Sequence, residues 1–402
     1  MKLDVEAVRA NYPALADGYA YLDGAAGTQV PSSVINAMSA AQAAGIGNEG
    51  GAFPASERAD RIVAHCRAAV AALTGGEPDG VVLGPSMTAL TYRFAAALGR
   101  EWMAGDEIVV SRLDHDANVR PWVQAAERAG ATVRWAEVEP DTGELPADQY
   151  ACLITERTRL VAVTAASNVL GTRPDVAAIT ALARAAGAVS YVDGVHATPH
   201  VPTDISALGA DLYATSAYKW SGPHIAAVVG APSLLDTLQP DKLVPSPDSV
   251  PERFELGTPP YESMAGVTAA VEHLAGLAAD GSADGLRDRL LVSMAAVERH
   301  EQELFAAMLA GLESMPHVRL FGRAASRTPT AFFTVKDQTP RQVAEHLATR
   351  KINVWNGHNY AWEVTGALGI RDAGSAVRAG LVRYNDAAEV DRLLAAVAAL
   401  GD

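Results

Sequence analysis

The chain has 402 residues, 49% of them hydrophobic, and its 32 basic and 47 acidic residues give a formal net charge of −15. This length allows a large core and two domains. The acidic balance disfavours binding to nucleic acid or to an anionic membrane surface, so we expect small-molecule ligands. The start MKLDVEAVRANYP lacks an apolar leader and no run of about 18 apolar residues occurs, so we expect a cytoplasmic protein. Two cysteines, Cys66 and Cys152, are too few for a disulfide framework or a cysteine-rich metal site.

Short apolar, β-branched runs in the first half of the chain have the composition of strands. We expect strands at residues 81–84, 107–111, 132–138, 160–167, 189–193 and 211–216. Helix patterns lie between several of them, at 123–130 and at 174–187. Strands that alternate with helices predict a parallel sheet covered on both faces, with ligands beyond the carboxyl ends of the strands.

The pattern changes after about residue 230, where a proline-rich stretch leads into a mixture of helices and strands. We expect helices at 265–279, 284–313, 342–351 and 388–400, and strands at 318–322, 330–336 and 352–356. These elements predict a smaller α+β domain. We therefore divide the chain into a large domain, residues 15–260, and a small domain, residues 261–402, and we expect residues 1–14 to pack on the small one.

Two ionisable residues stand at the ends of neighbouring predicted strands. Asp193 ends the run VSYVD, where a buried carboxylate needs a partner such as a cationic ring nitrogen. An aspartate there also suits a helix cap or a turn. Lys219, in TSAYKWSGPH, is the single lysine between Lys2 and Lys242. Pyridoxal phosphate (PLP) needs both groups, a lysine for the Schiff base and a carboxylate that keeps the pyridine nitrogen protonated.

A phosphate site and a stacking ring would complete such a cofactor site. The stretch VVLGPSMTAL places Ser86 and Thr88 where a helix should begin, and free N–H groups bind anions there, although both residue types are also ordinary caps. His115 follows a predicted strand, where an imidazole could stack on a cofactor ring or carry protons. The dinucleotide fingerprint and the P-loop motif are both absent.

Two other readings of these motifs are less well supported. His196 and His200 have the spacing of a metal-binding pair, but Pro199 argues against a helix and no acidic third ligand is evident, so we expect no metal site. The tetrad SAYK at 216–219 matches the S-x-x-K motif of penicillin-interacting hydrolases, which also requires K-T-G and S-D-N elements that are absent here.

Taken in order, the motifs resemble those of the class V aminotransferases of PLP fold type I, specifically the cysteine desulfurase-like subgroup. They are YLDGAAGT, GPSMTALT, GDEIVVSRLDHDANVRPW, ASNVLGT, VDGVHATPH, TSAYKWSGPH, FELGTPP, NGHNYA and VRAGLVRYNDAAEVDRLL. The resemblance implies a mainly parallel sheet sandwiched by helices in the large domain, a smaller C-terminal α+β domain, PLP as cofactor and a homodimer with a shared active site.

The resemblance also implies roles for single residues around the cofactor ring. Lys219 would be the Schiff-base lysine, Asp193 the partner of the pyridinium nitrogen, and His115 the ring that stacks on the cofactor. Asn168 would lie near the phenolic oxygen of the cofactor, together with His196, which occupies a position where the family often has a glutamine.

Further matches concern the phosphate and the substrate. The implied phosphate-binding residues are Ser86, Met87 through its backbone N–H, and Ser216, with Gly257 and Thr258 reaching the phosphate of the partner subunit. Arg378 would clamp the α-carboxylate of the substrate, a task suited to a bidentate guanidinium. Asn359 and Tyr360 lie in the loop expected to contact the substrate.

Two departures from the family bear on the reaction. Desulfurases carry a cysteine in the loop that reads GHNYA here, and this chain has Tyr360 at the matching place, while Tyr218 replaces the histidine that commonly precedes the lysine. We therefore expect a PLP-dependent enzyme that cleaves the C–S bond of cysteine or an S-substituted cysteine by β-elimination. Alternatives are a desulfurase with a non-loop thiol acceptor, an aminotransferase, an epimerase or a decarboxylation-linked deaminase, and, from another class, a non-catalytic binding protein.

Overall fold

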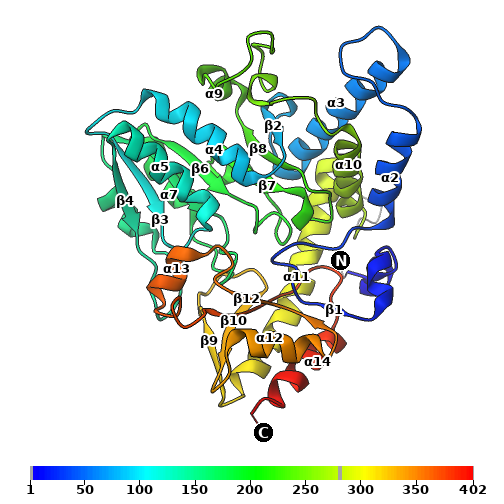
Figure 1. Cartoon of the computed structure of the whole chain (residues 1–402), viewed down its shortest axis with the longest axis vertical. Coiled ribbons are helices and arrows are strands. Elements are labelled where there is room, and N and C mark those ends of the chain that lie inside the picture. The colour runs from blue at the N-terminus through cyan, green and yellow to red at the C-terminus, as the bar shows by residue number, and fades with distance from the viewer. Residues whose placement is uncertain (1–2, 279–282, 402) are drawn as a thin grey trace.

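The structure, a computed structural model, describes residues 3–278 and 283–401 (Figure 1). Its largest element is a seven-stranded sheet in the order β2-β8-β7-β6-β5-β3-β4. In this order, the strands are Val81–Gly84, Ala226–Gly230, Leu212–Ser216, Val189–Asp193, Thr158–Thr164, Glu107–Ser111 and Thr132–Ala136. Only β8 runs antiparallel to its neighbours among these strands. The sheet is therefore mainly parallel, as expected.

Helices cover both faces of this sheet because each strand is apolar on both sides. In β3, Ile108 and Val110 face one hydrophobic cluster while Val109 faces the other. On the first face lie α4 (Met87–Leu98) and α5 (Arg120–Ala129), and on the second lie α3 (Pro54–Thr74), α7 (Val176–Ala185) and α10 (Tyr261–Ala275). This arrangement is the helix-sheet-helix sandwich predicted from the alternating pattern.

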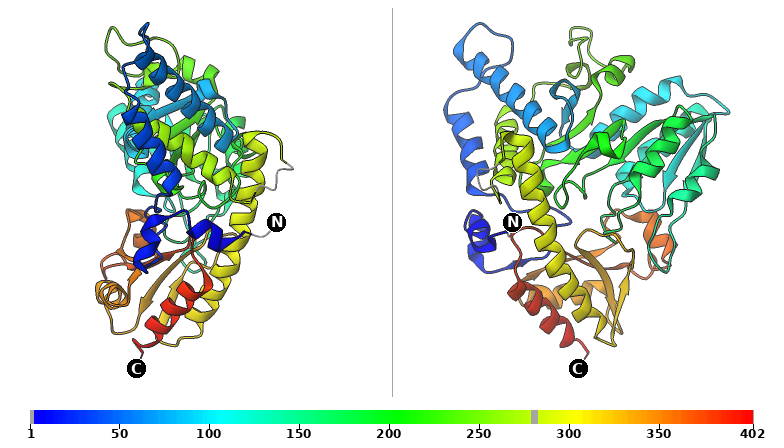
Figure 2. Two further views of the ribbon diagram at one scale, coloured as in Figure 1. Left: turned by 90° about the vertical axis from the view of Figure 1, so that its right-hand side faces the viewer. Right: turned by 180° about the vertical axis from the view of Figure 1, so that it is seen from behind.

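A second sheet of four antiparallel strands forms the lower part of the molecule in Figure 1. Its order is β12-β13-β10-β9, with bounds Trp355–Gly357, Ala376–Gly380, Thr330–Val335 and Val318–Phe321. The helices α11 (Gly285–Glu313), α12 (Pro340–Ala348) and α14 (Ala387–Ala398) contribute buried apolar residues here. Helix α11 extends from beside the large sheet down to this smaller one (Figure 2).

The N-terminal segment contacts both parts of the chain. Helix α1 (Val5–Arg9) places Arg9 against Asp386 and Glu389 at the start of α14, at 3.3 and 3.1 Å. Strand β1 (Ala20–Tyr21) pairs in parallel with β11 (Ile352–Asn353), and α2 (Ser32–Ala43) packs against α10. The remaining short helices are α6 (Tyr150–Leu153), α8 (Ile205–Leu208), α9 (Pro232–Thr237) and α13 (Trp362–Ala367).

Most predicted elements are confirmed, with small shifts of their ends. The single strand expected at 352–356 is wrong, because the run divides at Val354: β11 pairs with β1, and β12 pairs with β13. Strands β8 and β13 are not anticipated, since they are rich in alanine and glycine, which are poor strand formers. The helix expected at 265–279 is α10, which begins at Tyr261, and residue 279 lies outside the described residues.

The division into residues 15–260 and 261–402 stays a prediction. Helix α10, which lies just beyond residue 260, packs against α2 and α3 on the side of the large sheet. Among the described residues, no helix is both long and apolar enough to cross a membrane.

Candidate active site

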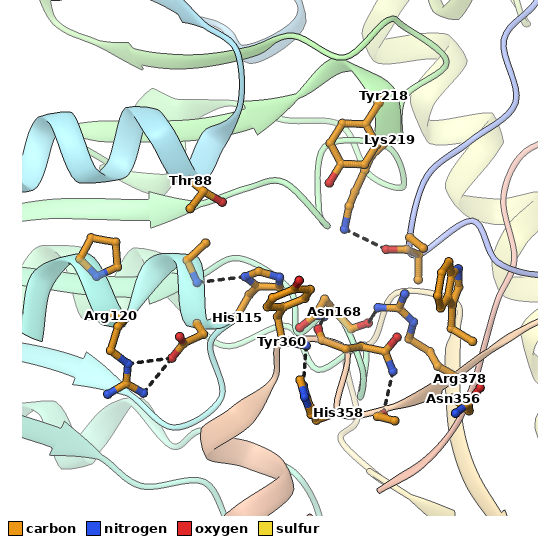
Figure 3. Close-up of a pocket in the computed structure, with 18 of the residues that line it drawn as sticks. Thr88, His115, Arg120, Asn168, Tyr218, Lys219, Asn356, His358, Tyr360 and Arg378 are labelled. Carbon is orange, nitrogen blue, oxygen red and sulfur yellow. Dashed lines mark hydrogen bonds and ion pairs between the residues drawn. The ribbon is translucent and has the colours of Figure 1, made fainter. Parts of the chain in front are cut away.

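The predicted site residues gather where β5, β6 and β7 end and α4 begins. A narrow cavity of about 70 Å³ there is lined by Asp193, Lys219, His196 and residues of the first turn of α4. It lies beside a wider cavity of about 970 Å³, which extends past Arg378 toward the loop 356–360 (Figure 3). Lys219, His115 and Asn168 line both cavities, so a ligand in the narrow one can meet a ligand in the wide one.

Lys219 is buried, and its ammonium group points into the site from the turn after β7. The Nζ atom donates a hydrogen bond to the carbonyl oxygen of Ala25, at 2.8 Å. Burial lowers the pKa of this amine to about 7, aided by the positive charge of Arg378 and opposed by the negative charge of Asp193. Near neutral pH a large share of the amine is therefore unprotonated and nucleophilic.

Asp193 is the last residue of β6 and is 5% exposed. Its Oδ1 atom accepts a hydrogen bond from the backbone N–H of Val195, at 2.9 Å. Burial raises the pKa of this carboxyl to about 6, while the Val195 hydrogen bond and the charge of Lys219 act in the opposite direction. The next residue must be Gly194, because a Cβ there would lie 1.9 Å from the ring of Tyr213. The close contact of this turn with Tyr213 fixes the backbone beside Asp193, whose side chain lines the narrow cavity.

His115 follows β3 at the start of a short turn. Its Nδ1 atom accepts a hydrogen bond from the backbone N–H of Ala117, at 3.0 Å. Burial, together with the charges of Lys219 and Arg378, lowers the pKa of the imidazole to about 3. The neutral ring therefore carries its proton on Nε2. The ring of Tyr360 stacks on it (Figure 3).

Asn168 and His196 each present an unpaired polar atom beside the narrow cavity. The side-chain amide of Asn168 donates to the carbonyl oxygen of Asn359 at 2.8 Å, and its Oδ1 atom is buried without a partner. His196 pairs through Nε2 with the hydroxyl of Thr330 at 3.0 Å, and its Nδ1 atom is likewise buried and unpaired. Buried polar atoms are normally hydrogen-bonded, so these two indicate a missing partner.

The first turn of α4 lines the same narrow cavity and has the features of an anion site. Ser86 is the N-cap, and its Oγ atom accepts from the N–H of Ala89, at 3.1 Å. The N–H groups of Met87 and Thr88 belong to the first turn, where no intrahelical acceptor is available. Ser216, the buried last residue of β7, lines the same cavity.

Gly257 and Thr258 do not join these residues. Both are exposed on the segment before α10 and line neither cavity of their own chain. A Cβ at Gly257 would meet no atom within 4 Å. Their contact with the phosphate of a partner subunit stays a prediction.

Arg378 lies on β13 at the base of the wide cavity and is 4% exposed. Its Nη1 atom donates to the carbonyl oxygen of Asn168, at 3.0 Å, while its Nε atom is buried and unpaired. Burial lowers the pKa of the guanidinium to about 10, so it remains charged at neutral pH. Asp23 is the nearby acidic group and also has an unpaired buried oxygen. A buried cation with free donors is suited to hold a carboxylate.

The loop that carries Asn359 and Tyr360 is fixed to the large sheet side of the site. Both residues have a positive φ, 49° and 59°, which is an uncommon conformation for residues other than glycine. The carbonyl oxygen of Tyr360 accepts from the N–H of Asp116 at 2.8 Å, and the amide of Asn359 donates to the carbonyl oxygen of Gly357 at 2.8 Å. Tyr360 and Asn359 line the wide cavity, and their contact with a substrate stays a prediction.

Several lining residues were not singled out from the sequence. Ala25 holds the amine of Lys219, and Tyr92 and Trp355 form part of the wall of the wide cavity. Arg120 lies at its outer end, where Asp116 and Glu363 accept from it at 2.8 and 2.9 Å. Ala25 belongs to the motif YLDGAAGT, which could have indicated it. No sequence pattern singled out Tyr92, Trp355 or Arg120.

Comparison with known proteins identifies the family. The profile of the family described as Aminotransferase class-V matches residues 20–393. The chain belongs to this family. It is 38% identical over 403 residues to an uncharacterized protein of Mycobacterium tuberculosis, and the match covers 100% of both chains. It is 32% identical over 416 residues to a protein named cysteine desulfurase from Klebsiella pneumoniae, with 98% of each chain covered.

The solved structures agree with the family and its cysteine desulfurase-like subgroup. The cysteine desulfurase CsdA from Escherichia coli superimposes with a TM-score of 0.86 at 27% identity, covering 99% of this chain and 98% of that one. This class-V aminotransferase chain is therefore an enzyme with PLP fold type I, and its cofactor is PLP.

The residues present fit that cofactor. The narrow cavity is lined by the free N–H groups of Met87 and Thr88, by the carboxyl group of Asp193 and by the amine of Lys219. The unpaired atoms of Asn168 and His196 provide polar partners beside it. In this class-V aminotransferase, therefore, PLP accounts for polar atoms that the protein alone leaves unsatisfied.

Proposed function

We propose that this PLP enzyme cleaves the C–S bond of cysteine or of an S-substituted cysteine by β-elimination. The observation that carries the proposal is the identity of residue 360, where the cysteine of the desulfurase loop is replaced by a tyrosine. Cys66 is buried in α3, where burial raises the pKa of its thiol to about 12, and Cys152 lies on α6. Neither cysteine lines the two cavities, so no thiol of the described chain is placed to take up sulfur.

Different residues of the site would bind the cofactor and orient the substrate in this reaction. PLP, when bound, withdraws electrons from Cα of the amino acid. With the cofactor bound, Asp193 would keep its ring nitrogen protonated, His115 would stack on its ring, and Ser86, Met87 and Ser216 would hold its phosphate. Arg378 binds the α-carboxylate of the substrate and so fixes the orientation of Cα relative to Lys219.

Lys219 takes the proton from Cα, for which a pKa of about 7 is well suited at neutral pH. The C–S bond then breaks and its electron pair leaves with sulfur, which takes up a proton to give hydrogen sulfide from cysteine or a thiol from an S-substituted cysteine. With one water consumed, the other products are pyruvate and ammonia. No redox partner is needed, and no sulfur is passed to the protein.

We also propose that the enzyme works as a homodimer. The exposed pair Gly257 and Thr258 lies outside the cavities of its own chain, which supports a contact with another subunit. Leu256, Leu243 and Val244 are exposed apolar residues of the same region, 64%, 67% and 96% exposed, and apolar patches mark association surfaces.

Product analysis tests the reaction. The PLP-loaded enzyme is mixed with L-cysteine and with S-methyl-L-cysteine, and pyruvate, alanine and racemised substrate are measured, with Lys219→Ala as the inactive control. Pyruvate that depends on Lys219 is the expected result. Alanine formed from cysteine would mean desulfuration, and racemised substrate would mean epimerisation. A protein that binds no PLP at all would overturn the enzyme assignment itself.

A further inference from the structure

Behind the narrow cavity lies a buried cluster of two histidines and one glutamate. His196 and His200 follow β6 and are 3% and 2% exposed, and Glu301, on α11, is 1% exposed. The Nδ1 atom of His200 lies 2.8 Å from Oε2 of Glu301. The rings of the two histidines meet edge to face, with centroids 5.0 Å apart and planes inclined by 73°.

All three side chains keep one unpaired polar atom. These atoms are Nδ1 of His196, Nε2 of His200 and Oε1 of Glu301. A buried polar atom without a hydrogen-bond partner destabilises the folded protein, and three such atoms in one cluster do so more strongly. Apolar side chains of similar size would fill the space without this cost, which indicates that the cluster serves the adjacent site.

The glutamate determines where the proton of His200 lies. A carboxylate this deeply buried requires a donor, and Nδ1 of His200 is the one within hydrogen-bond distance. The geometry therefore places a proton of His200 on Nδ1, facing the carboxylate. This is the arrangement in which a carboxylate orients a histidine that acts on a neighbouring group.

His196 is the member of the cluster that lines the cofactor cavity. Burial lowers the pKa of its imidazole well below the ordinary range, and the charges of His200, Lys219 and Arg378 act in the same direction. The ring is therefore neutral and has one proton to place on either nitrogen. The hydroxyl of Thr330, its partner at Nε2, can donate or accept, so it does not decide between the two.

We propose that His200 and Glu301 are positioning residues that select the protonated nitrogen of His196, and thereby its hydrogen bond to the ring oxygen of the cofactor. The negative charge of Glu301, transmitted by the edge-to-face contact of the two rings, favours one tautomer of His196 over the other. The proposal rests on PLP as the cofactor and does not depend on which reaction follows at Cα.

The substitution Glu301→Gln tests the proposal, since it keeps the shape of the side chain and removes its charge. Glu298→Gln is the matched control: Glu298 lies one turn earlier on α11 and pairs with Arg173 at 2.9 Å, away from the histidines. The first readout is ¹⁵N NMR of histidine-labelled apoenzyme, with His196 and His200 assigned from His→Gln variants. The wild-type spectrum is expected to show His200 protonated on Nδ1 and His196 as a single tautomer. The spectrum of Glu301→Gln is expected to show a mixture of the two tautomers of His196.

The second readout is the visible absorbance of the PLP-loaded enzyme as a function of pH. The titratable or charged groups beside His196 include His200, Lys219, Arg378, Asp193, His115 and Tyr218, and all six remain in both variants. Glu301→Gln is expected to shift the midpoint of the absorbance change by about one pH unit, a tenfold change in the proton equilibrium, and Glu298→Gln to leave it in place.

Each result decides the question. Unchanged histidine signals and an unchanged midpoint in Glu301→Gln would overturn the proposal, and so would an equal effect of Glu298→Gln. If Glu301→Gln fails to fold, the wild-type spectrum is still decisive, because a mixture of tautomers at His196 contradicts the proposed selection. A failure of β-elimination in the product analysis would leave these readouts intact, so the two proposals fail separately.

Discussion

The ring of Tyr360 stacks on the ring of His115, with centroids 5.4 Å apart and planes inclined by 28°. The backbone of Tyr360 is tied to the turn that follows His115 by the hydrogen bond to the N–H of Asp116. Tyr360 is itself 67% exposed, so one side supports His115 while much of the ring borders the wide cavity. The residue at the place of the desulfurase thiol therefore supports the proposed cofactor-stacking ring.

If Tyr360 only supports His115 and the substrate, Tyr360→Ala keeps the reaction and weakens it modestly. An aromatic pair contributes about 0.5–1.5 kcal/mol, which corresponds to a loss of about 2–12-fold in kcat/KM. The rate of pyruvate release from S-methyl-L-cysteine measures the loss of kcat/KM. Trp362→Ala is the control, because Trp362 does not line the wide cavity. A loss of kcat by more than about a thousandfold would instead give the phenol a chemical role.

Arg378→Ala is expected to raise KM for the amino-acid substrate. A hydrogen bond to a charged group contributes about 1.5–3 kcal/mol, so kcat/KM should fall by about 10–150-fold. Arg371→Ala serves as a control, because Arg371 stacks on Trp362 and lines neither cavity. A KM equal to that of the wild type would count against Arg378 as the carboxylate clamp.

Uptake of PLP by the apoenzyme should depend on the protonation of Lys219. Only the neutral amine reacts with the aldehyde of the cofactor, and burial lowers the pKa of this amine from 10.5 to about 7. The rate should therefore rise between about pH 6 and pH 8 and then level off. Stopped-flow absorbance measures it.

The substitution Asp193→Asn should shift the midpoint of this pH profile. Removal of the negative charge takes away the interaction that favours the ammonium form, so the midpoint should move to lower pH. A rate that continues to climb above about pH 9 in the wild type would mean that Lys219 titrates as an ordinary exposed lysine.

The buried ion pair between Arg67 and Glu255 should contribute strongly to stability. Arg67 donates to both carboxylate oxygens of Glu255, at 2.8 and 3.0 Å, and Glu255 also accepts from the N–H of Leu83 at the edge of the large sheet. Glu255→Ala leaves the guanidinium buried without its main partner, which costs about 3–5 kcal/mol.

Urea unfolding measures the free-energy change in Glu255→Ala, and Glu345→Ala is the control. Glu345 pairs with Arg341 on the surface of α12 at 2.7 Å, with both side chains more than half exposed, so its loss should change stability by less than about 1 kcal/mol. Equal changes in the free energy of unfolding for the two substitutions would show that the Arg67–Glu255 pair stabilises the protein no more than a surface ion pair does.

The parts of the fold that the sequence predicts well are those in which local pattern and burial agree. Asp193 and Lys219 stand at the ends of runs whose apolar, β-branched residues are buried on both faces, so their strands and their common edge follow from the pattern. Strand β13 has too much alanine and glycine to be seen in this way, and Arg378 on it was placed by its motif instead.

Contacts between distant segments were outside the reach of the sequence. The hydrogen bond from Lys219 to the carbonyl oxygen of Ala25 joins positions 194 residues apart, and no local sequence pattern predicts it. The same holds for His200 and Glu301, since a single glutamate in a long amphipathic helix looks like an ordinary exposed residue until the packing of α11 places it in the interior.

The hydrogen bond between Lys219 and Ala25 has a consequence for protein synthesis. Ala25 packs against Gly380, where an added Cβ would come within 2.8 Å of it, so the segment that receives the amine rests on one of the last strands to be made. A nascent chain that has left the ribosome only as far as Lys219 contains six strands of the large sheet but neither β8 nor β13, the strand on which Ala25 rests. The enzyme can therefore complete its site only near the end of translation, when the strand that carries Arg378 and Gly380 has emerged.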